Sequence, residues 1–248
     1  MKTIAITGSE GLIGQALVSA LQTFGYRLRR FDLRLPAGHS GQGNVLDAGD
    51  VARLVADCDG VIHLAAVSRV IWGERDPELC WATNVDGLRN VLDVAHRQPR
   101  KPWMIFASSR EVYGQPSVLP ASEETPREPV NVYGRSKVMG EELIEAARLD
   151  GLRASVIRLS NVYGSTTDHA DRVVPAFARA AVLGHSLRVE GAEHTFDFTH
   201  ISDVAQGIVA LVSRLDDGQC APPPIHFTYG PADDARAACT DGHRGCGK

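Results

Sequence analysis

The sequence has little of what marks nucleic-acid-binding, membrane or secreted proteins. Its 248 residues carry a net charge of −4 with an isoelectric point near 6.1, so a basic surface for nucleic acid is not expected. No apolar run approaches the length of a membrane span, and the N-terminus lacks the basic-then-apolar pattern of a signal peptide. A hydrophobic content of 44% allows a sizeable core, and we expect a cytoplasmic protein.

Cysteine and histidine lack the spacing that metal sites need. The five cysteines are odd in number, and they stand at positions 58, 80, 220, 239 and 246. Reduced thiols are therefore expected. The nine histidines form no cluster along the chain, and no metal site is predicted.

What the chain does have begins at its N-terminus. A strand predicted over residues 2–7 runs directly into a G-x-x-G-x-x-G loop formed by Gly8, Gly11 and Gly14, and an apolar helix pattern follows to Phe24. Such a loop brings backbone amides and a helix N-terminus close to a pyrophosphate. Glycines alone are a weak signal because turns also need them, but their place between a strand and a helix indicates a dinucleotide site.

A carboxylate ends the second predicted strand, which runs from Arg27 to Asp32. An acidic side chain there accepts hydrogen bonds from the adenosine ribose 2′-hydroxyl of NAD and repels the 2′-phosphate of NADP. Arg34 is the opposing signal, because its guanidinium can pair with that phosphate. We predict NAD as the cofactor, with tolerance of NADP left open.

Strands and helices then alternate along the chain. The predicted elements are a helix over 49–57, a strand over 60–65, a helix over 84–97, a strand over 103–107 and a last strand over 225–228. This alternation predicts an α/β fold with a doubly wound parallel sheet of the Rossmann type, whose ligands bind at the carboxyl ends of the strands. His63, alone on an apolar strand, is interpreted as a core histidine.

The strongest chemical pattern is a tyrosine followed four residues later by a lysine. Tyr133 and Lys137 share one face of a helix predicted over residues 133–149. A lysine ammonium beside a phenol lowers the tyrosine pKa from about 10, so that the phenolate can take a proton from a sugar or alcohol hydroxyl near neutral pH. An isolated pair of this kind is more often a surface feature. Here the glycine loop, Asp32 and the pair all fall at one sheet edge, which favours the chemical interpretation.

Together these residues resemble the extended short-chain dehydrogenase/reductase family, in its NAD-dependent nucleotide-sugar epimerase/dehydratase branch. The resemblance covers roughly residues 2–230 and is specific for the branch, not for the reaction. Its motifs are the glycine loop at 8–14, Asp32, His63-Leu64-Ala65-Ala66, Asn84, Ser108-Ser109 with Val112-Tyr113-Gly114, Tyr133-x-x-x-Lys137, Arg158 to Gly164, and Phe196 to Asp203.

The resemblance implies roles at the matching positions. Tyr133 would be the base, Lys137 would hold the nicotinamide ribose and set the tyrosine pKa, and Ser109 would bind the sugar hydroxyl, with Glu111 as a fourth catalytic candidate. The implied cofactor-binding residues are Gly8, Gly11, Leu12, Ile13, Gly14, Asp32, Arg34, Asn44, Val45, Leu64, Ala65, Ala66, Asn84, Ala107, Ser108, Tyr133 and Lys137. The implied substrate-binding residues are Ser68, Ser109, Arg110, Tyr133, Asn161 and Arg172.

Several departures from the family pattern bear on the reaction. Dehydratases of the family have an Asp-Glu pair after the catalytic Ser/Thr, but this chain has Arg110-Glu111, which counts against dehydration because the acid is missing. Decarboxylases of the family place a glutamate at the Glu111 position, so that alternative stays open. Ser165 stands where a proline is common, and Phe196 stands where many members have an arginine for the diphosphate.

The resemblance also implies the domain organisation. Residues 1–160 form the NAD-binding Rossmann domain, to which 196–230 partly return, while 161–195 form a partial substrate lobe and 231–248 an irregular tail. The tail has no Val, Ile, Leu, Phe or Met after Phe227, so it supplies no apolar helix face, and truncation or an altered frame near Tyr229 is one hypothesis beside natural shortening. The helices near 84–97 and 133–149 are expected to form a homodimer.

Three functions are therefore weighed. The first is an NAD-dependent epimerase of a nucleotide-linked sugar, acting by transient oxidation at C4 and return of the hydride. The second is a nucleotide-sugar dehydratase, decarboxylase or ketoreductase that uses Glu111. The third, from a different class, is an NAD-binding protein with an incomplete substrate lobe and little turnover. Neither the sugar nor the nucleotide is named by the sequence.

Overall fold

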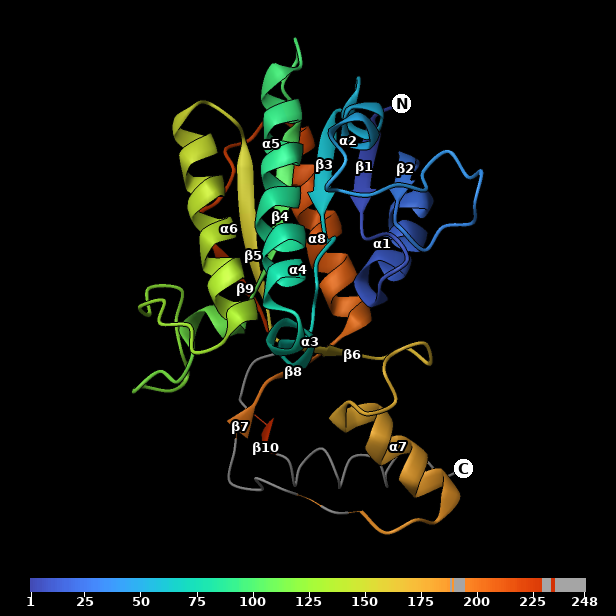
Figure 1. Cartoon of the computed structure of the whole chain (residues 1–248), viewed down its shortest axis with the longest axis vertical. Coiled ribbons are helices and arrows are strands. Elements are labelled where there is room, and N and C mark those ends of the chain that lie inside the picture. Colours follow the sequence, from blue (N-terminus) through green and yellow to red (C-terminus); the bar gives the residue numbers. More distant parts are fainter. Residues whose placement is uncertain (188, 190–194, 229–232, 235–248) are drawn as a thin grey trace.

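One parallel sheet forms the centre of the computed structural model, which describes residues 1–187, 189, 195–228 and 233–234. Its six strands lie in the order β2-β1-β3-β4-β5-β9, and every neighbouring pair is parallel (Figure 1). The strands are β1 Thr3–Thr7, β2 Arg27–Phe31, β3 Gly60–His63, β4 Trp103–Ser109, β5 Ala154–Leu159 and β9 Ile225–Phe227. The predicted doubly wound parallel sheet is confirmed.

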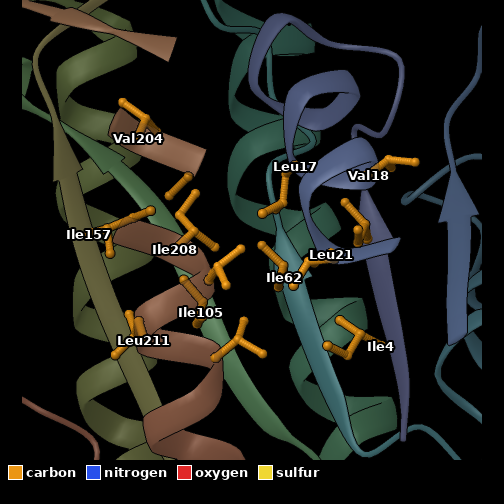
Figure 2. Close-up of a cluster of buried hydrophobic side chains, with 14 of the residues drawn as sticks. Ile4, Leu17, Val18, Leu21, Ile62, Ile105, Ile157, Val204, Ile208 and Leu211 are labelled. Carbon is orange, nitrogen blue, oxygen red and sulfur yellow. The ribbon is translucent and has the colours of Figure 1, made fainter. Parts of the chain in front are cut away.

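Helices cover both faces of this sheet. The α-helices of the described residues are α1 Leu12–Thr23, α2 Ala48–Val55, α3 Val70–Arg75, α4 Pro77–Trp81, α5 Gly87–Arg97, α6 Val132–Leu149, α7 Val173–Leu183 and α8 Ile201–Asp216. Helices α1 and α8 pack on one face, and α2, α5 and α6 pack on the other. Figure 2 shows Leu17 of α1 and Ile208 of α8 directed toward Ile62 and Ile105 on the strands. Burying each such side chain contributes about 1.5–3 kcal/mol, so these two layers hold the sheet rigid.

Smaller elements lie beyond the carboxyl edge of the sheet, below it in Figure 1. Strand β6, Asn161–Tyr163, pairs in parallel with β8, Phe198–His200. Strand β7, Thr195–Phe196, pairs with β10, Asp233–Asp234. Helix α7 lies on the same side of the sheet and, unlike α1 and α8, contains no buried residue. Among the described residues, no helix combines the length and apolarity needed to cross a membrane.

Two strand boundaries differ from the prediction. Strand β3 ends at His63 and not at residue 65, because the next two amides turn to donate to the Thr7 hydroxyl. Strand β4 continues to Ser109, two residues further than predicted, because β5 pairs with it as far as the Ser109–Leu159 position. The prediction contained no strand at β5 and so had no partner for those last residues.

The helical segment before α5 was also underestimated. The prediction begins one helix at Asn84, whereas the chain is already helical in α3 and α4 and then in a π-helical turn, Ala82–Asp86. Helix α4 starts at Pro77 because Asp76 caps it, accepting a hydrogen bond from the Leu79 amide at 2.9 Å. Helix α2 ends at Val55, earlier than the predicted residue 57.

Candidate functional site

The glycine loop between β1 and α1 leaves no room for side chains. Gly8 has φ +71°, and a Cβ on it would lie 2.7 Å from the Ala65 backbone nitrogen. A Cβ on Gly14 would lie 2.2 Å from the Gly8 carbonyl oxygen. The first turn of α1 carries no side-chain cap, so its amides stay open toward the loop. These residues form a cradle of backbone N–H groups that fits a pyrophosphate.

Thr7 fixes the end of β3 against this loop. Its hydroxyl oxygen accepts hydrogen bonds from the amides of Leu64 and Ala65 at 3.2 and 3.1 Å. The same oxygen lies 2.9 Å from His63 Nδ1. Burial, helped by the charge on Lys137, lowers the pKa of His63 to about 3, so the imidazole stays neutral. The prediction of a core histidine is confirmed.

Asp32 follows β2 at the same edge, and both of its oxygens already have donors. Oδ2 accepts from the Glu10 amide at 3.0 Å, and Oδ1 accepts from the Arg34 amide at 2.9 Å. The Arg34 guanidinium adds bonds of 3.1 and 3.2 Å. Burial opposes ionisation, but these hydrogen bonds hold the pKa of Asp32 below its usual value. Asp32 and Arg34, which are opposing signals for the choice between NAD and NADP, therefore form an ion pair. A ribose hydroxyl must compete with the exposed Arg34 side chain for the Asp32 carboxylate.

Asn84 is one of the predicted cofactor residues, and the fold already uses its amide. Its Oδ1 accepts from the Val67 amide at 2.7 Å, while Nδ2 donates to the Val67 carbonyl and to Ser136 Oγ at 3.2 and 2.9 Å. The side chain thus ties the loop after β3 to α6. Val45, also predicted at the cofactor, packs on Gly87 at the start of α5. Both residues shape the frame of the site.

The tyrosine and lysine lie in the first turns of α6, beside the end of β4. Asn131 begins this helix by accepting a hydrogen bond from the Gly134 amide at 2.7 Å. Tyr133 is 9% exposed and Lys137 is 3% exposed. The Lys137 ammonium donates to the Ala107 carbonyl at 2.8 Å and lies 5.7 Å from the centre of the Tyr133 ring. The predicted pair is thus brought together at the carboxyl edge of the sheet.

The prediction that Lys137 lowers the pKa of Tyr133 is wrong for this arrangement. Burial raises the pKa of Tyr133 to about 12, and a hydrogen bond with Ser109 provides the largest opposing effect. Burial likewise lowers the pKa of Lys137 to about 8. The ammonium is directed to the Ala107 carbonyl, and Ser109 is the group that most lowers the pKa of the phenol.

Glu111 lies next to this group but is held by its neighbours. Its Oε2 accepts from Asn131 Nδ2 at 2.8 Å, and its Oε1 pairs with Arg110 at 3.0 Å. The Arg110 guanidinium also lies 5.6 Å above the centre of the Phe196 ring, where many family members would carry an arginine. Glu111 therefore connects the Ser109 turn to the residue that begins the Tyr133 helix.

A buried charge network behind the site was missed by the sequence analysis. Glu141 is fully buried and binds Arg158 through both oxygens, at 2.9 and 2.7 Å, and Arg127 at 3.1 Å. Ser108, predicted at the cofactor, donates to Glu141 at 2.5 Å, so its hydroxyl belongs to this network instead. Glu141 lies four residues after Lys137, and that helical spacing was the available signal.

The predicted substrate residues Asn161 and Arg172 meet at a cavity of about 190 Å³ between β6 and the start of α7. Tyr163 and Phe198 bring aromatic surface to the same cavity. Ser68, the remaining predicted substrate residue, is exposed on the loop after β3. No group of three or more potential metal ligands gathers in the described part of the chain.

The chain matches a family model and many curated relatives, among them a decarboxylase and an epimerase. The model, described as the NAD dependent epimerase/dehydratase family, covers residues 4–223. The UDP-N-acetyl-alpha-D-glucosaminuronate decarboxylase of Bacillus cytotoxicus is 32% identical over an alignment of 244 positions, which covers 88% of this chain and 73% of that protein. The UDP-glucose 4-epimerase of Lactobacillus helveticus is 30% identical over an alignment of 228 positions, which covers 83% of this chain and 68% of that protein.

Solved structures share the fold over nearly the whole chain. UDP-glucose 4-epimerase from Brucella ovis, in complex with NAD, superposes with a TM-score of 0.83 at 25% identity, covering 96% of this chain and 81% of that one. RMD from Pseudomonas aeruginosa, complexed with NADPH, gives 0.81 at 26% identity, covering 95% and 80%. Both nicotinamide dinucleotides therefore occur among the structural relatives.

Proposed function

The chain belongs to the NAD dependent epimerase/dehydratase family, and from that premise we propose that it is an NAD-dependent epimerase of a nucleotide-linked sugar. The observation that carries the proposal is the buried Tyr133, whose pKa the Ser109 side chain lowers against burial, at the edge where the glycine cradle opens. The epimerase of L. helveticus, at 30% identity, supports it. UDP-sugars are the proposed substrate class.

The residues present fit the dinucleotide. Backbone amides after Gly11, in the first turn of α1, would hold the pyrophosphate, and Asp32 would hold the adenosine ribose in place of Arg34. Asn44 lies beside Val45 in the loop before α2 and would approach the adenine. The nicotinamide group would supply reversible hydride transfer at C4 of the sugar, and its positive charge would favour the phenolate of Tyr133.

Residues of this chain would transfer the proton of the sugar hydroxyl. Tyr133 would take the proton of the C4 hydroxyl and return it, since its phenol is the acid–base group at this edge. Ser109 would hydrogen-bond the same sugar oxygen and keep the phenol aligned. Lys137, anchored on the Ala107 carbonyl, would hold the nicotinamide ribose. Because Tyr133 and Lys137 are almost fully buried, bulk water is kept from the reacting atoms.

A decarboxylase is the second candidate, because Glu111 stands beside Ser109 and the decarboxylase of B. cytotoxicus is 32% identical. Its substrate would be a nucleotide-linked uronic acid. The position of Arg110 speaks against dehydration, since the guanidinium is paired with Glu111 and cannot supply a proton as an acid would.

Mass spectrometry and product analysis test these proposals. Small molecules released from the denatured purified protein should include NAD. UDP-glucose should then give UDP-galactose without loss of carbon dioxide, whereas release of carbon dioxide from UDP-glucuronate would favour the decarboxylase. If NAD is bound and no UDP-sugar is converted, the protein binds nucleotide without turnover. We also propose a homodimer through α5 and α6, for which light scattering should give twice the chain mass.

A further inference from the structure

A long-range ion pair joins the loop after β3 to the segment before α7. Arg69 donates to both oxygens of Asp171, with Nη1–Oδ1 at 3.0 Å and Nη2–Oδ2 at 2.8 Å, although the residues are 102 positions apart. Such bidentate geometry fixes direction as well as distance. The pair therefore connects the Rossmann core to the segment that carries Arg172.

Two ring contacts reinforce this ion pair. The Arg69 guanidinium lies 5.3 Å from the centre of the Trp72 ring. Trp72 in turn meets His169 edge-on, with ring centres 4.9 Å apart and planes at 87°. Arg69 thus binds Asp171, and Trp72 packs against His169. We call these four residues, Arg69, Trp72, His169 and Asp171, the clasp.

The clasp flanks the cavity that contains Arg172 and Asn161. Arg172 is held by Asp168, whose Oδ1 accepts from Nη1 at 3.2 Å and from the His169 amide at 2.8 Å. The Asp168 side chain is 2% exposed, and its Oδ2 is buried with no hydrogen-bond partner among the described residues. A buried unpaired carboxylate oxygen is costly, so this arrangement is not explained by folding alone.

Hydrophobic packing does not fix the position of the segment before α7. Helix α7, which follows Arg172 directly, has no buried residue, so it offers little burial energy to fix the chain before it. An exposed ion pair contributes little to stability, and the Asp171 side chain is 66% exposed. The clasp is therefore too weak to stabilise the whole fold. It is sufficient to fix the position of the segment before α7, which has little other packing.

We propose that Arg69 is a positioning residue which, through the clasp, sets Arg172 in place for the diphosphate of the nucleotide sugar. The proposal rests on the nucleotide-sugar function above and adds a residue from the Rossmann core to the substrate site. Arg69 acts through Asp171, since its own guanidinium is already used by that carboxylate. Removing Arg69 is expected to impair substrate binding and leave the NAD cradle intact.

Calorimetric binding of UDP and UDP-glucose to the NAD-loaded protein tests the proposal. Arg69→Gln and Asp171→Asn should each raise the Kd for both ligands about 10-fold, a typical cost of slight misplacement of a binding group. Arg75→Gln, the same change at an exposed arginine in α3, the helix that directly follows Arg69, should have no effect. NAD content and Tm should stay unchanged in all variants. The charge-reversed double variant R69D/D171R should recover most of the lost affinity.

The outcomes separate the clasp from the function on which it rests. If the unmodified protein binds neither UDP nor UDP-glucose, both proposals fail. If it binds them and the Arg69→Gln variant binds equally well, only the clasp is wrong. A variant that loses NAD and Tm together with UDP, without recovery in the double variant, would show a purely structural role and overturn the positioning proposal.

Discussion

Tyr133 and Lys137 are both buried groups whose pKa values move toward the neutral form. Burial raises the pKa of Tyr133 to about 12 and lowers that of Lys137 to about 8. The phenol is therefore protonated at neutral pH in the protein without ligands, and in the proposed epimerase the charge of bound NAD would favour the phenolate. At the scale of single residues, the site is prepared to hold a proton and to release it when the cofactor is present.

Tyr133→Phe tests the acid–base role. The substitution keeps the ring and its packing, so Tm and NAD affinity should be retained, while turnover of a UDP-sugar should fall about 10²–10⁴-fold. Both quantities should be measured on one preparation. If turnover is unchanged in a folded variant, Tyr133 has no part in the chemistry.

Ser109→Ala and Lys137→Met should affect the pH dependence differently. The hydrogen bond with Ser109 lowers the pKa of Tyr133, so its loss should raise that pKa further and move the ascending limb of the pH–rate profile to higher pH. Lys137→Met should mainly weaken NAD binding, since the ammonium is directed to the Ala107 carbonyl. If Lys137→Met shifts the ascending limb of the pH–rate profile more than Ser109→Ala does, Lys137 is the group that lowers the pKa of Tyr133, as the sequence predicted.

Asp32 and Arg34 should set the choice between NAD and NADP. Asp32→Ala frees Arg34 from its ion pair and removes the charge that repels a 2′-phosphate, so preference should shift toward NADP. Arg34→Ala should do the opposite, because the carboxylate is then uncompensated. Fluorescence titration of both dinucleotides measures the ratio of Kd values, and tighter NADP binding by the unmodified protein would contradict the assignment.

Helices, strands and loops that are defined by spacing within one segment were predicted correctly from the sequence. Features that depend on pairing with a distant segment were not. The glycine loop and α6 were found from sequence because spacing along one segment defines them. The end of β4 was misplaced because Ser109 becomes a strand residue only through pairing with β5. The Glu141–Arg158 pair and the clasp were missed for the same reason, since their partners lie 17 and 102 residues apart.

Gly14→Ala tests how tightly the cradle is built. A Cβ at residue 14 would lie 2.2 Å from the Gly8 carbonyl oxygen, so the loop has to shift and NAD binding should be lost or greatly weakened. Gly11→Ala is the matched control, because its Cβ would meet the same oxygen at 3.1 Å and demands only a small adjustment. Equal NAD affinity in the two variants, measured by titration, would show that close approach in this loop is unimportant.

Across the whole molecule, the buried network joins the site to the far edge of the sheet. Glu141 of α6 binds Arg158 of β5, and Arg158 donates to Tyr113 Oη at 2.6 Å. Tyr113 is hydrogen-bonded to His226 of β9, the strand at the sheet's edge. Ser108, adjacent to Ser109, also donates to Glu141. The Glu141 carboxylate of α6 thus aligns this helix with β4 and, through Arg158 and Tyr113, with β9.

Glu141→Ala should therefore destabilise the protein and disturb the site together. Removal of one partner leaves the Arg158 guanidinium buried and unpaired, which typically costs about 3–5 kcal/mol. Urea unfolding should show that loss, while Glu142→Ala, at the exposed neighbouring position, should change the free energy of unfolding by less than about 0.5 kcal/mol. Replacing both charges, as in E141L/R158M, should recover stability because no unpaired charge remains, yet turnover should stay low since Ser108 loses its acceptor. If the double variant recovers turnover as well, the network serves stability alone, and the alignment of Ser109 must come from β4 pairing.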